Sequence, residues 1–319
     1  MTAGPAWLGH TAGMRSLLLL LACLLIPTAA VAQDWSDDTP VATILGALGV
    51  EAQPHAVSGT PEQIQQGEDL VLRGRTVGPD GKRTKWQSKG FRCTDCHNIV
   101  REDPDLAVAD PAARLDFAVT NDLPFLMGTT LYGITDRSSW FNDDYVKKYG
   151  DLVKPANGSL REAIQLCSIE CSQGRALDDW EIEAILAWLG QQGLKYGDLV
   201  DAPPIADVQA AAAGDAEAKS AMAAQIQARF LPKSPATFVE PPAAHGKDDP
   251  GYPEEGDPAR GKIIYERSCL HCHARGGPTN YLLADRRGRY RELLRNMPQD
   301  TKWSFYVAIR RGTKPAFHP

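Results

Sequence analysis

The sequence contains few residues of several informative types. Among 319 residues there are five methionines, seven cysteines and seven histidines. The longest apolar run, Leu17–Ile26, has ten residues, whereas a helix that crosses a bilayer needs about 20. Acidic residues outnumber basic ones, 40 to 34, and this balance argues against nucleic acid as a partner. We therefore expect neither a membrane-spanning protein nor a nucleic-acid-binding one.

Four of the cysteines stand in two copies of one pattern. Segments 93–97 (CTDCH) and 269–273 (CLHCH) are both C-x-x-C-H, the pattern that attaches a c-type haem. Two thiols three positions apart reach the two vinyl groups of one porphyrin, and the adjacent imidazole binds the iron as proximal ligand. The pattern predicts two covalently attached haem c groups, with these attachment residues and proximal ligands: Cys93, Cys96 and His97; Cys269, Cys272 and His273.

Two other chemistries share part of this pattern. C-x-x-C by itself is also typical of thioredoxin-like redox pairs and of half of a zinc site. A redox pair gives no reason for a histidine at the next position in both copies. Zinc needs further ligands near each motif, and the remaining cysteines and histidines are too few and too scattered to supply them. Haem attachment accounts for all three residues of each motif.

The start of the chain has the pattern of a cleavable secretion signal. Arg15 precedes the apolar run, and Ala30-Val31-Ala32 matches a cleavage site of the A-x-A kind. Residues 1–32 are therefore predicted to be a signal peptide that delivers the chain to the periplasm, because haem of this kind is attached outside the cytoplasm. Their removal takes away one basic residue and leaves a net charge near −7.

Helix signals precede both motifs. Thr60, Pro61 and Gln63 form a capping box with proline in the first turn, and Asp257 with Pro258 repeats this start before the second motif. After the first motif, apolar residues recur at i, i+3, i+4 and i+7, which predicts a further helix: Ile182, Ile185, Leu186 and Leu189. This order resembles the class I cytochrome c fold, in which a first helix leads into the motif and a closing helix packs across it.

The resemblance implies an all-α protein with two class I cytochrome c-like domains. We expect the first at 33–197, with a loop insertion at about 74–91, and an acidic, proline-rich linker at 198–256. The second domain is expected at 257–319. It shows no closing helix, so we expect either that it is cut short or that the natural chain continues beyond it.

The insertion is strongly basic. From Arg73 to Arg92 there are seven basic residues and one acidic residue, Asp80, together with several glycines that favour a loop. Three roles are open: a cationic dock for an acidic partner, an anion site near the haem, or a solvated loop that neutralises haem propionates. A second basic run, 285–314, gives the molecule an electrical polarity that favours redox protein partners docked electrostatically.

The sequence leaves the sixth ligand of each iron open. Class I cytochromes usually place a methionine just before the closing helix, but no methionine lies between Met127 and that helix, and Cys171 stands there instead. Met127 and Cys171 are therefore the candidate distal ligands of the first haem. An oxidising compartment also favours a disulfide between Cys167 and Cys171. For the second haem the candidate is Met297.

The segment around Cys171 is also similar to the dihaem cytochromes of thiosulfate oxidation, the Sox system. Cys171-Ser-Gln-Gly-Arg175 is followed by Trp180-Glu181 and an Ala/Leu-rich helix. In that family a cysteine ligates haem and transfers sulfur beside an arginine, which implies a catalytic Cys171 and an anion contact at Arg175.

The leading prediction from the sequence is a periplasmic dihaem cytochrome c that carries single electrons between redox partners. One alternative is a dihaem redox enzyme of the thiosulfate-oxidising or peroxidase-like kind. The other is a haem subunit of a membrane respiratory complex.

Overall fold

The structure, a computed structural model, describes residues 34–236 and 256–279. These residues form helices joined by loops, and the only β-type pairing among them is two isolated bridges, Pro40–Lys195 and Val77–Arg83. The prediction of an all-α chain is confirmed for this part of the molecule. No helix within it has the length and apolar character needed to cross a membrane. The predicted signal peptide, the basic run 285–314 and Met297 lie outside the described residues.

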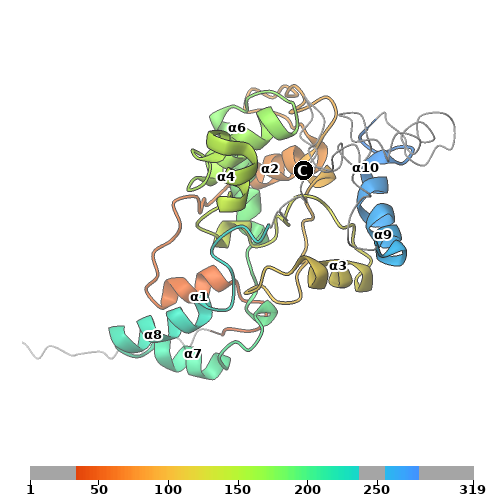
Figure 1. Cartoon of the computed structure of the whole chain (residues 1–319). Helices are drawn as coiled ribbons and strands as arrows, with labels where there is room; N and C mark the ends of the chain where they lie inside the picture. The colour runs from red at the N-terminus through yellow and green to blue at the C-terminus, as the bar shows by residue number, and fades with distance from the viewer. Residues whose placement is uncertain (1–33, 237–255, 280–319) are drawn as a thin grey trace, which may run out of the picture. The chain divides into compact units, whose positions relative to one another are not determined.

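Figure 1 labels most of the helices along the chain. Their bounds are α1 Val41–Ala47, α2 Pro61–Arg73, α3 Pro111–Thr120, α4 Asp143–Tyr149, α5 Leu160–Leu166, α6 Asp179–Leu189, α7 Ile205–Ala212, α8 Ala216–Gln227, α9 Pro258–Ile264 and α10 Leu270–His273. Single 3-10 turns include η1 Cys93–Asp95, η2 Ile134–Asp136, η3 Gly150–Val153, η5 Gly190–Gln192 and η6 Tyr196–Asp198. Two π-helical turns, η4 Cys167–Cys171 and η7 Tyr265–Cys269, directly continue α5 and α9. Such turns are rare and occur frequently at functional sites.

Capping contacts confirm the predicted helix starts. The Thr60 hydroxyl accepts a hydrogen bond from the Gln63 amide at 3.2 Å, and the Gln63 side chain accepts one from the Thr60 amide at 2.9 Å. The Asp257 carboxylate accepts from the amides of Ala259 and Arg260 at 2.9 and 3.0 Å. Each cap satisfies amide donors that a helix N-terminus otherwise leaves without a partner.

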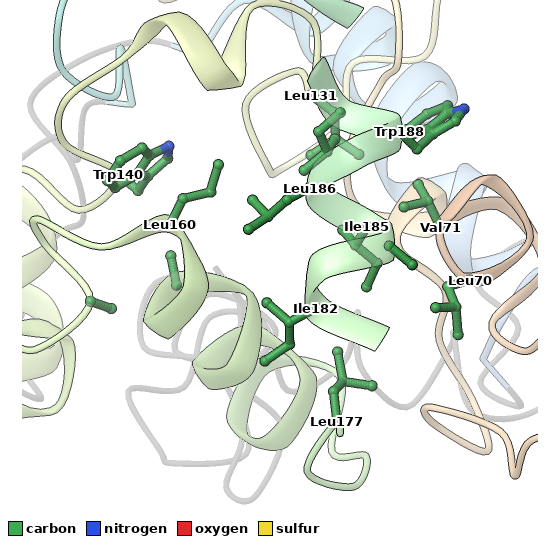
Figure 2. Packing of buried hydrophobic residues seen from close by; sticks show 14 residues of the cluster. Leu70, Val71, Leu131, Trp140, Leu160, Leu177, Ile182, Ile185, Leu186 and Trp188 are labelled. Atoms are coloured by element: carbon green, nitrogen blue, oxygen red, sulfur yellow. The ribbon is translucent and has the colours of Figure 1, made fainter. Parts of the chain in front are cut away.

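The larger core forms where α6 crosses α2. Figure 2 shows α6 between two groups of side chains, with Leu70 and Val71 of α2 on one side and Trp140 and Leu160 on the other. Almost the whole of α6 is buried, and burial of apolar surface contributes roughly 25 cal/mol per Å². The crossing of these two helices agrees with the expectation that a closing helix packs across the first one.

The crossing depends on Gly67. A Cβ atom at this position would lie 2.0 Å from the carbonyl oxygen of Ala184 and 2.9 Å from Cβ of Trp188, so only glycine lets the two backbones approach this closely. Gly261 precedes the second motif as Gly67 precedes the first, but no described atom lies within 4 Å of an added Cβ there. Within the described residues, α9 therefore has no equivalent crossing at its glycine.

A second core joins α1 to α7 and α8 (Figure 1). Val41 and Ile44 of α1, Val208 of α7 and Ile226 of α8 are completely buried in it. The sequence places 205–227 in a linker, whereas the structure packs these residues against α1. α7 and α8 are rich in alanine, and each helix packs closely through only one or two larger apolar residues. The segment therefore shows little amphipathic pattern in the sequence.

Replacement of Gly67 by alanine is expected to lower the free energy of unfolding by about 1–3 kcal/mol, because the added methyl group overpacks the α2–α6 crossing. Gly46→Ala is the matched control, since Gly46 lies in α1 with nothing within 4 Å of an added Cβ. It should leave stability unchanged or raise it by up to about 1 kcal/mol. Urea unfolding followed by circular dichroism measures both. Equal stability of the two variants would contradict the close crossing.

Candidate functional site

The first C-x-x-C-H motif is built on a single tight turn. Cys93–Asp95 forms the 3-10 turn η1, and the Asp95 carboxylate accepts a hydrogen bond from the Arg92 amide at 2.7 Å. The amide of His97 donates to the carbonyl oxygen of Cys93 at 2.9 Å. These bonds fix the backbone that carries both thiols and the imidazole of the motif.

Both thiols of this motif are neutral at physiological pH. Burial raises the pKa of Cys93 to about 11, and burial together with nearby thiols and Asp95 raises the pKa of Cys96 to about 12. The reactive cysteine of a dithiol redox pair has the opposite property, a lowered pKa that maintains a thiolate. The surroundings of Cys93 and Cys96 therefore do not favour thioredoxin-like chemistry.

One hydrogen bond sets the orientation of the His97 imidazole. Its Nδ1 lies 2.6 Å from the carbonyl oxygen of Thr129, and because a carbonyl can only accept, Nδ1 carries the proton and Nε2 presents its lone pair. Burial lowers the pKa of His97, which favours the neutral ring. Gly128 lies against the imidazole, since a Cβ there would be 2.5 Å from Cε1 and Nδ1. Metal-binding histidines are typically held in this way, by a second ring N–H donated to a carbonyl or carboxylate.

A buried ion pair positions the backbone around Thr129. Glu102, which is 1 % exposed, pairs with Arg114 at 3.0 Å. The Glu102 carboxylate also accepts from the Thr130 amide at 2.6 Å, and Arg114 donates to the carbonyl oxygen of Leu126 at 2.7 Å. The two charged side chains thus hold the chain on both sides of the carbonyl group that orients the imidazole.

Sequence reasoning did not find Glu102 or Arg114. Both residues stand in a polar stretch between the first motif and Met127, and no spacing rule links a carboxylate to a guanidinium at that separation. Their burial is the only sign of their role.

The other two cysteines of the described residues, Cys167 and Cys171, lie in the π-helical turn η4, next to the first motif. Cys167 and Cys171 are free thiols in the structure, so the disulfide that the sequence left open is not formed there. They share a hydrogen bond, which lowers the pKa of Cys171 and raises that of Cys167. The charge of Cys171 contributes to the raised pKa of Cys96, and Cys167 is similarly influenced by Cys93. The fold therefore brings this cysteine pair to the motif.

Aromatic rings of α4 stand beside the cysteine pair. Phe141 and Tyr145 meet edge to face with ring centroids 5.0 Å apart, and Tyr145 stacks on Tyr149 at 6.1 Å. Burial raises the pKa of both tyrosines, and Cys171 contributes to each shift. These rings form an aromatic cluster beside the cysteine pair, and sequence reasoning did not single them out.

Met127 also lies in a segment that contacts the first motif. It directly precedes Gly128, whose amide donates to the carbonyl oxygen of Cys96 at 2.8 Å and whose α-carbon lies against the His97 imidazole. Met127 is 38 % exposed. The structure therefore brings the segments of both candidate ligands, Met127 and Cys171, to the first motif.

Arg175 forms a structural ion pair with Glu181. Both of its terminal nitrogens bind the carboxylate of Glu181 at 2.6 Å, and this carboxylate is completely buried. A bidentate pair with a buried partner is costly to break. The predicted contact between Arg175 and an anionic substrate is therefore not supported, because Glu181 already occupies the guanidinium.

The second motif ends a continuous helical segment made of α9, η7 and α10. Nδ1 of His273 lies 3.1 Å from the hydroxyl oxygen of Thr279, and this hydroxyl donates to the carbonyl oxygen of Cys272 at 3.0 Å. Since the hydroxyl proton is used, its oxygen is able to accept from Nδ1. His273 thus resembles His97, because Nδ1 of each ring faces an oxygen acceptor of the chain. The acceptor is Thr129 for His97 and Thr279 for His273.

Hydrogen bonds join the two motif segments. The Phe125 amide donates to the carbonyl oxygen of Arg267 at 3.1 Å, and the Arg267 guanidinium pairs with Asp122 at 3.1 Å. Sγ of Cys272 lies 3.9 Å from the carbonyl oxygen of Asp95. The second motif is therefore adjacent to the first.

Comparison with family models, with curated proteins and with solved structures finds no match for this chain. Within residues 34–236 and 256–279, no three or more histidine, cysteine, aspartate or glutamate side chains are grouped to hold a metal ion. The fit of a haem thus rests on the first motif itself: two thiols on one turn, an imidazole fixed through Nδ1, and a glycine that leaves space for the ring.

Glu102→Gln is expected to lower the free energy of unfolding by about 3–5 kcal/mol, because it leaves the buried charge of Arg114 without its partner. It should also weaken the protection of the His97 Nδ1 proton against exchange, measured by NMR. Glu266→Gln is the control, since it breaks the exposed Lys262–Glu266 pair at 3.5 Å, at a cost of about 1 kcal/mol or less. Similar losses in both variants would rule out the positioning role of Glu102.

Proposed function

We propose that this chain is a periplasmic dihaem cytochrome c that carries single electrons between redox proteins. The observation that carries the proposal is the hydrogen bond from His97 Nδ1 to the Thr129 carbonyl oxygen, beside two thiols on one turn. This arrangement presents Nε2 as a ligand and both sulfur atoms for thioether bonds. Each attached haem would supply one iron that gains and loses a single electron.

In each motif the two cysteines would attach the haem and the histidine would bind its iron. Cys93 and Cys96 would attach the first haem, and His97 would be its proximal ligand. In the second motif the same roles belong to three further residues: Cys269, Cys272 and His273. The contact between the motif segments, including Cys272 with Asp95, supports electron exchange between the two centres.

For the distal position of the first haem we choose Cys171 over Met127. Met127 is 38 % exposed, and the segment that carries it contacts His97 on the proximal imidazole itself. Cys171 lies in a π-helical turn beside Cys96 and next to the rings of α4. A thiolate ligand favours the oxidised iron, whereas methionine raises the reduction potential.

One of the two cationic groups on which the enzymatic alternative depends, Arg175, is already paired, whereas the basic loop near Arg73 is not excluded by this contact. A thiosulfate-oxidising role for Cys171 needs a neighbouring cation for the substrate anion, and the predicted cation, Arg175, is bound to Glu181. The proposed partners are redox proteins that dock electrostatically, and a membrane respiratory complex is one such partner.

The first test counts the haem groups. The protein is produced in a host that attaches c-type haem, and a pyridine haemochrome assay is expected to find two haems in each polypeptide. The double variant Cys93→Ala/Cys96→Ala should retain one haem, because the second motif is unchanged. Cys167→Ala is the control and should retain two. A wild-type protein without haem, or with zinc in its place, would refute the proposal.

The second test identifies the distal ligand of the first haem. EPR and near-infrared spectra of the ferric protein are expected to show low-spin iron with a thiolate ligand. This signature should disappear in Cys171→Ala, with a rise in reduction potential, and persist in Met127→Leu. A thiolate signature that survives in Cys171→Ala would eliminate Cys171, and loss of a methionine band in Met127→Leu would assign the position to Met127.

A further inference from the structure

A cationic pocket lies beside the first motif, among groups that the proposed electron transfer does not use. Its volume is about 250 Å³. Its walls come from the end of α2, the basic insertion and the residue that precedes Cys93. The side chains that matter for its chemistry are four arginines, one carboxylate and one indole: Arg73, Arg75, Arg83, Arg92, Asp69 and Trp86.

The positive charge of this pocket is only partly compensated. Arg73 pairs with Asp69 at 2.6 Å. The other arginines of the pocket, Arg75, Arg83 and Arg92, take part in no ion pair with the residues that the structure describes. Three guanidinium groups around one small space repel one another unless an anion lies between them.

Part of the pocket wall is held in place. The guanidinium of Arg75 stacks on the ring of Trp86, 3.9 Å from its centroid. This contact positions the guanidinium group and leaves its N–H donors available. Within the insertion, the Thr84 amide donates to the carbonyl oxygen of Thr76 at 2.8 Å. Arg175 ties the same loop to α6 through the carbonyl oxygen of Lys85, at 3.2 Å. The backbone of the insertion and the Arg75 guanidinium are therefore held in place, whereas the side chains of Arg83 and Arg92 are exposed.

Haem propionates are an alternative anionic partner for these arginines. A porphyrin carries its two vinyl groups and its two propionates on opposite edges. The pocket includes Arg92, which directly precedes Cys93, so it lies beside a cysteine that would attach a vinyl group. Neutralisation of haem propionates stays the alternative role of the insertion, and the binding experiment below separates it from a site for a free anion.

We propose that this pocket binds a small oxyanion of charge −2, of the sulfate or phosphate class. Guanidinium forks match the oxygen atoms of such anions in paired hydrogen bonds, and the volume of the pocket admits one anion with its bridging waters. A dianion bound beside Cys93 would stabilise the oxidised iron of an attached haem, so its binding would lower the reduction potential of the first centre. Binding itself requires only the polypeptide, and the effect on potential rests on the proposed function.

Isothermal titration calorimetry of the full-length haem-loaded protein with sulfate, at ionic strength held constant with sodium chloride, tests the binding. One saturable site is expected. Arg83→Gln should weaken it by about tenfold or more, because a charge-assisted hydrogen bond is lost. Trp86→Leu should also weaken it, since it frees Arg75. Lys89→Gln is the matched control, because Lys89 is an exposed cation of the same loop outside the pocket wall.

Two outcomes would overturn the proposal: no saturable binding of sulfate or phosphate, or an equal loss of affinity in Lys89→Gln and Arg83→Gln. Potentiometric titration with and without sulfate then tests the effect on the first centre, and an unchanged potential would overturn that part of it. Absence of haem from protein produced in a haem-attaching host would contradict the proposed function, and saturable binding of sulfate to that same protein would still support the anion site. The two proposals therefore fail separately.

Discussion

The imidazole of His97 is held by the carbonyl oxygen of Thr129, 2.6 Å from Nδ1. Without this bond the ring would be free to present either nitrogen, and the orientation of the imidazole relative to the two thiols would not be fixed. The carbonyl group keeps its position because Glu102 and Arg114 bind the backbone on both sides of it. A buried ion pair is a costly way to hold a loop, since both charges must leave water. Here the ion pair holds the loop whose Thr129 carbonyl group orients the His97 imidazole.

The same requirement explains where the rigid parts of the chain lie. α2 precedes the first motif and crosses α6. At the crossing Gly67 of α2 lies directly against the backbone of Ala184 in α6, so α2 cannot shift easily. α6 in turn supplies Glu181, which anchors Arg175 and, through it, the basic insertion. The core, the motif and the insertion thus form one mechanically continuous unit. The second core, made of α1, α7 and α8, lies outside this chain of contacts.

Sequence patterns predicted the parts of the fold that depend on local chemistry. The capping box at Thr60 and the apolar period of α6 are such features, because a cap or an amphipathic face is written in neighbouring residues. The site was predicted only as far as its side chains have a pattern. The Thr129 carbonyl is a backbone group with no sequence signature, and the Glu102–Arg114 contact arises from tertiary folding. The packing of 205–227 escaped prediction for a different reason, since alanine-rich helices need few large residues to seat them.

Two opposing charges meet at the proposed first centre. A thiolate from Cys171 places negative charge on the iron and favours its oxidised state. The arginines of the pocket beside Cys93, including Arg83 and Arg92, would favour the reduced state of an attached haem, because positive charge nearby opposes the loss of an electron. An oxyanion in the pocket would cancel the positive charge of the arginines and leave the negative charge of the thiolate. On these assignments the potential of the centre depends on whether the pocket is filled, which gives the basic insertion a role that a surface loop beside a simple electron carrier does not need.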